Sequence, residues 1–159
     1  SIEGFYGPPW SDAERRTLLD WLTRFGLETW LFAPKDDPCH RAAWREPYPV
    51  AEAARIGALL RECQARRIDF VWAVSPGLDI RHADDTDAAA LLARYAELHR
   101  LGCRSFALLL DDIQGALDPA DLARFGSLAA AQAHLADAVL AFTRARAPGG
   151  RLFFCPTPY

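Results

Sequence analysis

The sequence lacks several features that would assign it to a common class of protein. No apolar run reaches the roughly 18 residues that span a bilayer, so no membrane span is expected. No G-x-G-x-x-G segment follows the first apolar run, which argues against a dinucleotide-binding sheet. With 18 basic and 21 acidic residues, the net charge of -3 predicts no basic surface for nucleic acid or an anionic membrane.

Metal-ligand spacing is also absent. Cys39, Cys63, Cys103 and Cys155 form no C-x-x-C pair, and the four histidines are dispersed without a ligand-like pair. We therefore expect free, packed thiols, with no disulfide framework, no metal site and no cofactor. Free thiols are typical of a reducing compartment, which favours a cytoplasmic protein.

One alternation is present from end to end: a short apolar run, a loop, and then a stretch with helical spacing. The apolar runs, which we expect to be strands, are residues 2–6, 29–33, 70–74, 106–110 and 152–155. The stretches with helical spacing are residues 12–25, 51–66, 86–101 and 119–142. Strands that are apolar throughout are usually parallel, so five strands alternating with four helices predict an α/β fold.

Two parallel architectures fit this alternation, a doubly wound sheet and part of an eight-stranded (β/α)8 TIM barrel. A complete barrel needs about 200 residues or more. The 159 residues of this chain would supply a little over half of one, namely the first five strands and four helices.

Polar residues follow every expected strand. They are Glu3, Gly4 and Tyr6, then Lys35, Asp36 and Asp37, then Ser75 and Asp79, then Asp111 and Asp112, and finally Thr157 and Tyr159. The carboxyl ends of the strands form the active-site face in parallel βα folds. The clustering therefore locates a site without identifying its chemistry.

Asp111 and Asp112 directly follow the apolar run 106–110. Their spacing leaves two interpretations open: a pair of catalytic carboxylates, or a helix cap beside a solvated aspartate. In a two-step glycosidase with an enzyme nucleophile, the carboxylates flank the scissile bond about 5–5.5 Å apart. Adjacent side chains cannot easily do this, so one aspartate would protonate the leaving oxygen while the other holds a substrate group that acts as the nucleophile.

Other polar and aromatic residues have two interpretations each. Lys35 could bind substrate hydroxyls or form a surface salt bridge. Trp10, Trp44 and Tyr48 could stack on a sugar or anchor their loops. The acidic run 79–87 is expected to be a solvated loop and helix N-terminus.

Several segments together resemble glycoside hydrolase family 84. They are residues 2–10 (IEGFYGPPW), 33–37 (APKDD), 44–48 (WREPY), 75–80 (SPGLDI), 104–107 (RSFA) and 111–113 (DDI). They occur in order over almost the whole chain, so the resemblance is highly specific. That family contains the O-GlcNAcases and bacterial β-N-acetylglucosaminidases, and residues 102–109 and 153–157 look closest to the animal O-GlcNAcases.

The resemblance implies a barrel catalytic domain and a retaining, substrate-assisted hydrolysis through an oxazoline intermediate. It implies that Asp111 orients the acetamido N–H of the sugar and that Asp112 acts as general acid and then as general base. Gly4, through its backbone carbonyl, and Lys35 are implied to bind sugar hydroxyls. Tyr159 is implied to hydrogen-bond near the acetamido group, and no cofactor is implied.

In the family, the barrel continues and later strands complete the sugar pocket. Residues 1–159 are therefore expected to be the N-terminal portion of a catalytic barrel whose C-terminal portion is absent, and to be incomplete as an enzyme. The expected substrate is a GlcNAc-modified protein or glycan. The two open sheet edges are expected to pair with the missing half-barrel or with a second copy of the chain.

Two other functions stay open on the sequence. One is a non-catalytic sugar-binding or assembly half-barrel, which has no need of two adjacent acids. The other is a Mg²⁺ site for phosphoryl chemistry, built from Asp36, Asp37, Asp111 and Asp112.

Overall fold

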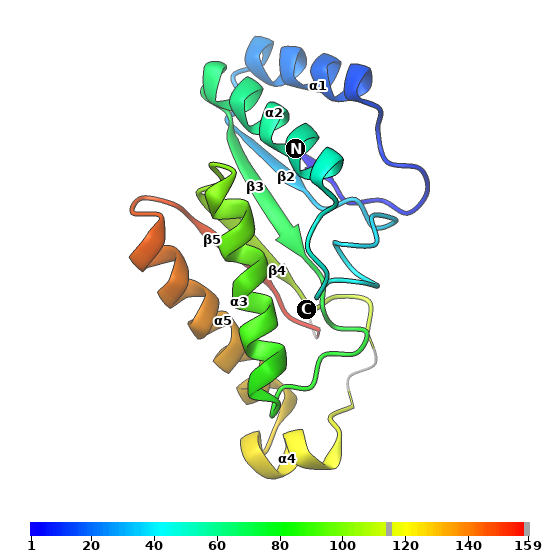
Figure 1. Ribbon diagram of the computed structural model, residues 1–159, viewed down its shortest axis with the longest axis vertical. Helices are drawn as coiled ribbons and strands as arrows, with labels where there is room; N and C mark the ends of the chain where they lie inside the picture. The colour runs from blue at the N-terminus through cyan, green and yellow to red at the C-terminus, as the bar shows by residue number, and fades with distance from the viewer. Residues whose placement is uncertain (114–115, 158–159) are drawn as a thin grey trace.

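The computed structural model describes residues 1–113 and 116–157, which form five strands and five helices (Figure 1). The strands are β1 (Ile2–Glu3), β2 (Thr29–Phe32), β3 (Asp69–Val74), β4 (Ser105–Leu109) and β5 (Leu152–Cys155). The helices are α1 (Asp12–Arg24), α2 (Val50–Ala65), α3 (Asp85–Arg100), α4 (Pro119–Phe125) and α5 (Leu128–Arg146). All five expected strands are present, although β1 ends at Glu3 rather than at residue 6.

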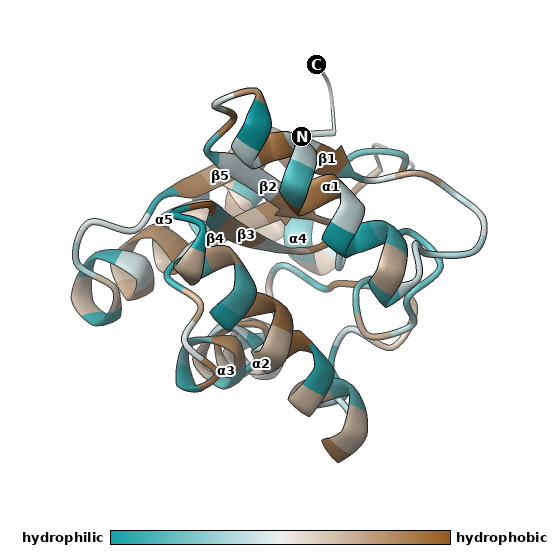
Figure 2. Cartoon of the chain, turned by 90° about the horizontal axis from the view of Figure 1, so that it is seen from above, coloured by the Kyte–Doolittle hydropathy of each residue, from teal (hydrophilic) through white to brown (hydrophobic). Residues whose placement is uncertain are grey.

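The strands form one parallel sheet in the order β1-β2-β3-β4-β5. Because βαβ crossovers are right-handed in nearly all cases, an order without reversal brings the helices to the same face of the sheet. Figure 2 shows α2, α3 and α5 against one side of the hydrophobic strands. A doubly wound sheet would reverse its strand order, so the structure confirms the partial barrel.

The two faces of the sheet carry side chains of different size. The face toward the helices carries large residues, including Trp30, Phe70, Trp72 and Phe106. The opposite face carries mostly smaller ones, in a cluster of Leu31, Ala33, Val71, Ala73 and Ala107. Burial of both faces explains why the strands are apolar throughout, and in a barrel the second face points to the interior.

The last helical stretch differs from expectation, because it is two helices rather than one. Gly126 adopts a left-handed conformation (φ 72°) that ends α4, and the Ser127 side chain then accepts from the Ala130 N–H to begin α5. No single helix within residues 1–113 and 116–157 is long and apolar enough to cross a membrane. Only α4 and α5 taken together reach that composition, and they are bent by 76°.

Candidate active site

One lysine joins the two adjacent aspartates. Lys35 follows β2 and Asp111 follows β4, so both lie at the carboxyl edge of the sheet. The Lys35 Nζ atom lies 2.8 Å from Asp111 Oδ2 and 3.7 Å from Asp112 Oδ2. Lys35 is the only lysine in the sequence, and its side chain is 5% exposed. The strand-end pattern is therefore confirmed for these three residues, and Lys35 is a buried ion-pair partner rather than a surface one.

The two carboxylate oxygens of Asp111 have different environments. Oδ2 accepts a charge-assisted hydrogen bond from Lys35. Oδ1 is buried and has no hydrogen-bond partner among the residues that the structure describes. An unsatisfied buried acceptor costs about 1–3 kcal/mol, so such an atom requires an explanation. A donor from a bound ligand would satisfy it.

Asp112 has an unusual backbone conformation. Its φ of 56° is left-handed, a region that aspartate tolerates better than most non-glycine residues. Its Oδ2 atom accepts from the Tyr6 hydroxyl (3.2 Å), and its carbonyl accepts from Arg41 Nη2 (3.1 Å). Its side chain is 44% exposed, so this carboxylate reaches solvent while that of Asp111 is largely covered.

The helix-cap interpretation of this aspartate pair is wrong. The residue that caps α4 is Asp118, whose Oδ1 atom accepts from the Asp121 N–H at 2.9 Å. Neither Asp111 nor Asp112 caps any helix in the part of the chain that the structure describes.

The four aspartates of the magnesium hypothesis do not converge. Asp36 accepts from the Gly7 N–H (3.1 Å), and Asp37 accepts from the Tyr48 hydroxyl (2.9 Å). The positive charge between the other two is Lys35 itself. Within the described part of the chain, no three His, Cys, Asp or Glu residues are grouped to hold a metal ion. Burial raises the pKa of Asp37, which agrees with a structural role in holding its own loop through Tyr48 and Cys39.

One other strand-end residue, Glu3, turns away from the site. Glu3 is fully buried and receives two hydrogen bonds from Arg15 of α1, Nη2 to Oε1 at 2.8 Å and Nε to Oε2 at 3.1 Å. Its Oε1 atom also accepts from the Trp10 N–H. Glu3 pairs with Phe32 and shares its face, which is the one toward the helices. Ser75 is buried as well, but it has the parity of Val71 and Ala73, on the opposite face of the sheet. The sequence pattern does not reveal this difference.

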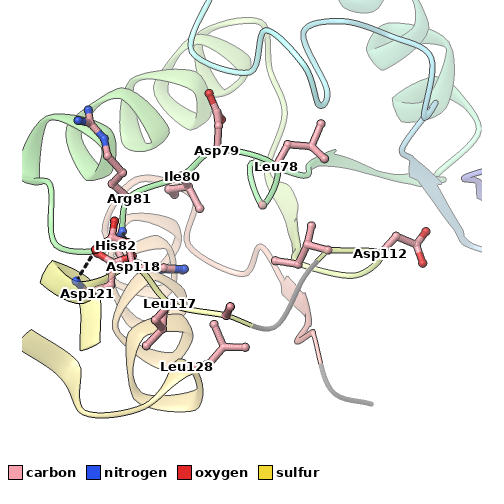
Figure 3. Close-up of a pocket in the computed structure, with 13 residues that line it drawn as sticks. Leu78, Asp79, Ile80, Arg81, His82, Asp112, Leu117, Asp118, Asp121 and Leu128 are labelled. Carbon is pink, nitrogen blue, oxygen red and sulfur yellow. Dashed lines mark hydrogen bonds between the residues drawn. The ribbon is translucent and has the colours of Figure 1, made fainter. Parts of the chain in front are cut away.

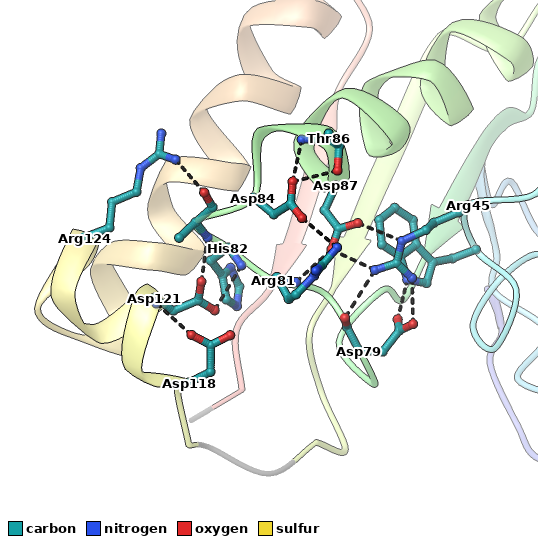
Figure 4. Close-up of polar contacts among 12 residues, drawn as sticks. Arg45, Asp79, Arg81, His82, Asp84, Thr86, Asp87, Asp118, Asp121 and Arg124 are labelled. Atoms are coloured by element: carbon teal, nitrogen blue, oxygen red, sulfur yellow. Dashed lines mark hydrogen bonds and ion pairs between the residues drawn. The ribbon is translucent and has the colours of Figure 1, made fainter.

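The loop aromatics and the acidic run hold the loops in place. Trp44 is fully buried, and its Nε1 atom donates to Asp79 Oδ1 at 2.8 Å. Arg45 donates to Asp79 and forms two bonds to Asp87 (Figure 4). Asp87 is 3% exposed, so a solvated acidic run is wrong for this residue. The hydrogen bonds from Arg45 lower the pKa of Asp87.

A pocket of about 550 Å³ lies beside Asp112 (Figure 3). The loop between β3 and α3 lines one side through residues 77–82, and Asp118 and Asp121 of the α4 region line the other. Asp121 accepts from the backbone N–H groups of His82 and Ala83, so it joins the two sides. Asp112 lines the edge of this pocket, and Figure 3 shows its carboxylate pointing away from the residues of the α4 region.

Two expected sugar-binding residues stay predictions. Gly4 follows β1 in a stretch where the Phe5 carbonyl accepts from the Lys35 N–H at 3.4 Å, so it lies next to the Lys35 segment. Its role in binding a hydroxyl is not tested by this contact. Tyr159 lies outside the described residues.

The cysteines match the packed-thiol expectation. All four are free, and Cys39, Cys63 and Cys103 are buried. Burial raises the pKa of Cys63 and of Cys103 to about 12, so these thiols are unreactive.

Arg41 is the residue of this site that the sequence patterns miss. It lies in an irregular loop without periodicity, and its contacts to Tyr6 and Asp112 span 35 and 71 positions of the chain. The burial of its side chain is what distinguishes Arg41 from other loop arginines. Burial cannot be read from the sequence, so no sequence signal indicates this residue.

Comparisons with known proteins agree with this geometry. The chain matches the family described as beta-N-acetylglucosaminidase over residues 1–159. It is 39% identical over 158 residues to the protein O-GlcNAcases of Rattus norvegicus and Mus musculus, covering 99% of this chain and 17% of each relative. A mutant O-GlcNAc hydrolase of Thermobaculum terrenum superposes with a TM-score of 0.94 at 29% identity, over 99% of this chain and 34% of that one. The match over the whole chain shows that it belongs to the beta-N-acetylglucosaminidase family.

Proposed function

We propose that this chain carries the catalytic aspartates of a retaining β-N-acetylglucosaminidase that removes GlcNAc from modified proteins or glycans. The observation that carries the proposal is the Lys35-bound pair at the end of β4, with Oδ1 of Asp111 buried and unpaired among the described residues. The rodent relatives are named protein O-GlcNAcases, which favours a GlcNAc-modified protein as the substrate. The chain spans 17% of those relatives, so the activity is proposed for the whole protein.

In the first step, Asp111 accepts the N–H of the sugar 2-acetamido group through Oδ1. The acetamido oxygen attacks the anomeric carbon, and the bond from that carbon to the leaving oxygen breaks. Asp112 gives its proton to the leaving oxygen, Asp111 takes the N–H proton, and an oxazoline forms on the sugar. Lys35 fixes the Asp111 carboxylate through Oδ2, which leaves Oδ1 for the substrate.

In the second step, a water molecule attacks the anomeric carbon and gives a proton to Asp112. The oxazoline opens as Asp111 returns the proton to its nitrogen. GlcNAc leaves with its original β configuration because the carbon is inverted twice. The geometry supports a substrate nucleophile, since both carboxylates approach one ammonium group from one strand end. An enzyme nucleophile and a general acid lie on opposite sides of the glycosidic bond, and carboxylates in this arrangement cannot easily do so.

Three further points belong to the same proposal. Gly4 and Tyr159 bind the sugar, and the edges of β1 and β5 pair with more polypeptide, either the rest of a barrel or a second copy of the chain. Ile2 on β1 is 64% exposed and Phe154 on β5 is 39% exposed, which supports contact at both edges. The protein is cytoplasmic, in keeping with its free cysteines.

The test is turnover of aryl GlcNAc glycosides by the whole protein. Asp112→Asn should slow a substrate with a poor leaving group by about 10²- to 10⁴-fold, and a substrate with a good one much less. Asp111→Asn should slow both substrates, because the nucleophile needs orienting in each. Asp20→Asn is the matched control, since Asp20 lies on α1 and its side chain, among the described residues, pairs only with Arg66.

Two results would reject the proposal. One is an Asp112→Asn variant that hydrolyses the poor substrate at the wild-type rate. The other is activity that disappears with excess chelator and returns with Mg²⁺, which would favour phosphoryl chemistry. Binding of an oxazoline mimic without any turnover by the whole protein would instead support a non-catalytic sugar-binding module.

A further inference from the structure

Arg41 contacts Asp112 on two sides at once. Its Nη2 atom donates to the backbone carbonyl of Asp112 at 3.1 Å. Its Nη1 atom donates at 2.8 Å to the hydroxyl of Tyr6, and that hydroxyl donates at 3.2 Å to Asp112 Oδ2. One guanidinium group therefore contacts the backbone of Asp112 directly and its carboxylate through Tyr6. The planar fork of arginine suits this arrangement, because its donors have fixed relative directions.

The guanidinium is held in place before any substrate binds. Arg41 is 9% exposed, and its N–H donates to the carbonyl of Pro38 at 3.2 Å. The preceding residue, His40, joins the loop to the end of β3: its ring Nδ1 atom lies 2.9 Å from the Ala73 carbonyl, and its own carbonyl accepts from the Ser75 N–H at 2.8 Å. These bonds fix the backbone from which the Arg41 side chain extends, so Arg41 has little freedom to move.

The first consequence concerns the backbone of Asp112. Its left-handed conformation, φ 56°, is unfavourable for a residue with a side chain. The bond from Arg41 to the Asp112 carbonyl opposes relaxation to an ordinary conformation. Such a relaxation would rotate the carboxylate away from Lys35 and Tyr6.

The second consequence concerns which oxygen of Asp112 carries the proton. Because Arg41 donates to the Tyr6 oxygen, the Tyr6 hydroxyl proton is directed onward to Asp112 Oδ2. Oδ2 is thus occupied as an acceptor, and Lys35 Nζ lies 3.7 Å from it. The proton of the neutral acid is then carried on Oδ1, away from the lysine.

We propose that Arg41 is a positioning residue that holds Asp112 in the orientation required for general-acid catalysis, through the Asp112 carbonyl and through Tyr6. The inference rests on the proposed function of Asp112 as the general acid. Arg41 itself touches neither the substrate nor the reacting atoms. Its effect should therefore appear only where proton donation to the leaving group limits the rate.

The test compares two aryl GlcNAc glycosides, one with a good and one with a poor leaving group, using the whole protein. Arg41→Met keeps the length of the side chain but removes its donors. We expect kcat on the poor substrate to fall about 10- to 100-fold, with less than about a 3-fold loss on the good one and little change in KM. Tyr6→Phe removes one hydroxyl, and we expect the same dependence on the leaving group with a smaller loss.

The matched control is Arg45→Met, four positions along the same loop. Arg45 bonds to Asp79 and Asp87 and makes no hydrogen bond to Asp112 within the described residues. It should change the rates on both substrates by the same factor. Arg41→Lys keeps the charge but is shorter and lacks the planar fork of donors with fixed directions, so we expect only partial recovery of kcat on the poor substrate.

Equal losses on both substrates in Arg41→Met and in Tyr6→Phe would overturn the proposal, because that pattern describes a structural role. If Arg41→Met does not fold, the Tyr6→Phe result decides alone, since loss of one hydroxyl leaves the loop bonds of Arg41 intact. If Asp112→Asn itself shows no dependence on the leaving group, the proposed function fails rather than the positioning role. The two failures are therefore distinguishable.

Discussion

Lys35 and Asp111 form an ion pair between two strands that are not neighbours in the sheet. Their Nζ and Oδ2 atoms lie 2.8 Å apart at the ends of β2 and β4, on either side of β3. The same ammonium group lies 3.7 Å from Asp112 Oδ2. One buried cation therefore compensates two carboxylates that would otherwise repel each other at the edge of the sheet.

Replacement of Lys35 by methionine should destabilise the protein as well as inactivate it. Breaking a buried pair costs about 3–5 kcal/mol, and the partial exposure of both aspartates reduces this to about 1–3 kcal/mol. Urea unfolding measures the change. Arg16→Met is the control, because Arg16 pairs with Glu62 on the surface and should cost less than about 1 kcal/mol. A Lys35→Met protein as stable as the control would contradict this account of the site.

The buried pair of Glu3 and Arg15 should contribute more to stability than any surface pair. Arg15 is 4% exposed and Glu3 is fully buried. Removal of either charge leaves the other one buried without its nearest partner, so Glu3→Gln and Arg15→Met should each cost about 3–5 kcal/mol. The double variant should lose less than the sum of the two single variants. Additive losses in urea unfolding would show that the residues do not act as a pair.

Acid should weaken the fold through His40. Burial lowers the pKa of His40 to about 4 from 6.5, and the charges of Lys35 and Arg41 act in the same direction. The unfolded chain therefore binds more protons between pH 6.5 and about 4, so stability is complete above pH 6.5 and falls as the pH drops through this window. The loss from this one residue amounts to about 3 kcal/mol. Burial also lowers the pKa of His82, which adds to the same trend.

His40→Asn separates this contribution from the rest. The asparagine amide can replace the ring Nδ1–H as a donor to the Ala73 carbonyl, and it carries no titrating group. The free energy of unfolding should then depend less steeply on pH between 6.5 and 4. His134→Asn is the control, because His134 is exposed on α5. An unchanged slope in His40→Asn would mean that other groups cause the acid sensitivity.

The fold can be predicted from the sequence because strands that are buried on both faces of a sheet are apolar at every position. Residues 70–74 and 106–110 therefore indicate central parallel strands without any structure, and the two aspartates that follow the second run indicate the active edge. The sequence pattern does not indicate the break between α4 and α5, because the apolar spacing continues across it. The glycine-serine dipeptide at 126–127 is its only local signal.

The candidate site can be predicted from the sequence only in part. The sequence indicates which residues follow each strand, but not which of them face one another. Glu3 and Lys35 both come at strand ends, yet Glu3 pairs with α1 and Lys35 with the aspartates. Contacts such as those of Arg45 with Asp87, 42 positions apart, arise from the packing of loops and leave no periodic pattern.

The last prediction concerns the edges of the sheet. Within the described residues, β1 and β5 each pair with only one strand, and parallel edges of this kind pair readily with other chains. Residues 1–159 alone should therefore self-associate, and Ile2→Lys should reduce association because a charge at an edge disfavours strand pairing. Val50→Lys is the control, because Val50 is 88% exposed at the start of α2 and lies on no strand. Light scattering measures the mass, and a stable monomer of the unaltered chain would show that the edges are protected by another means.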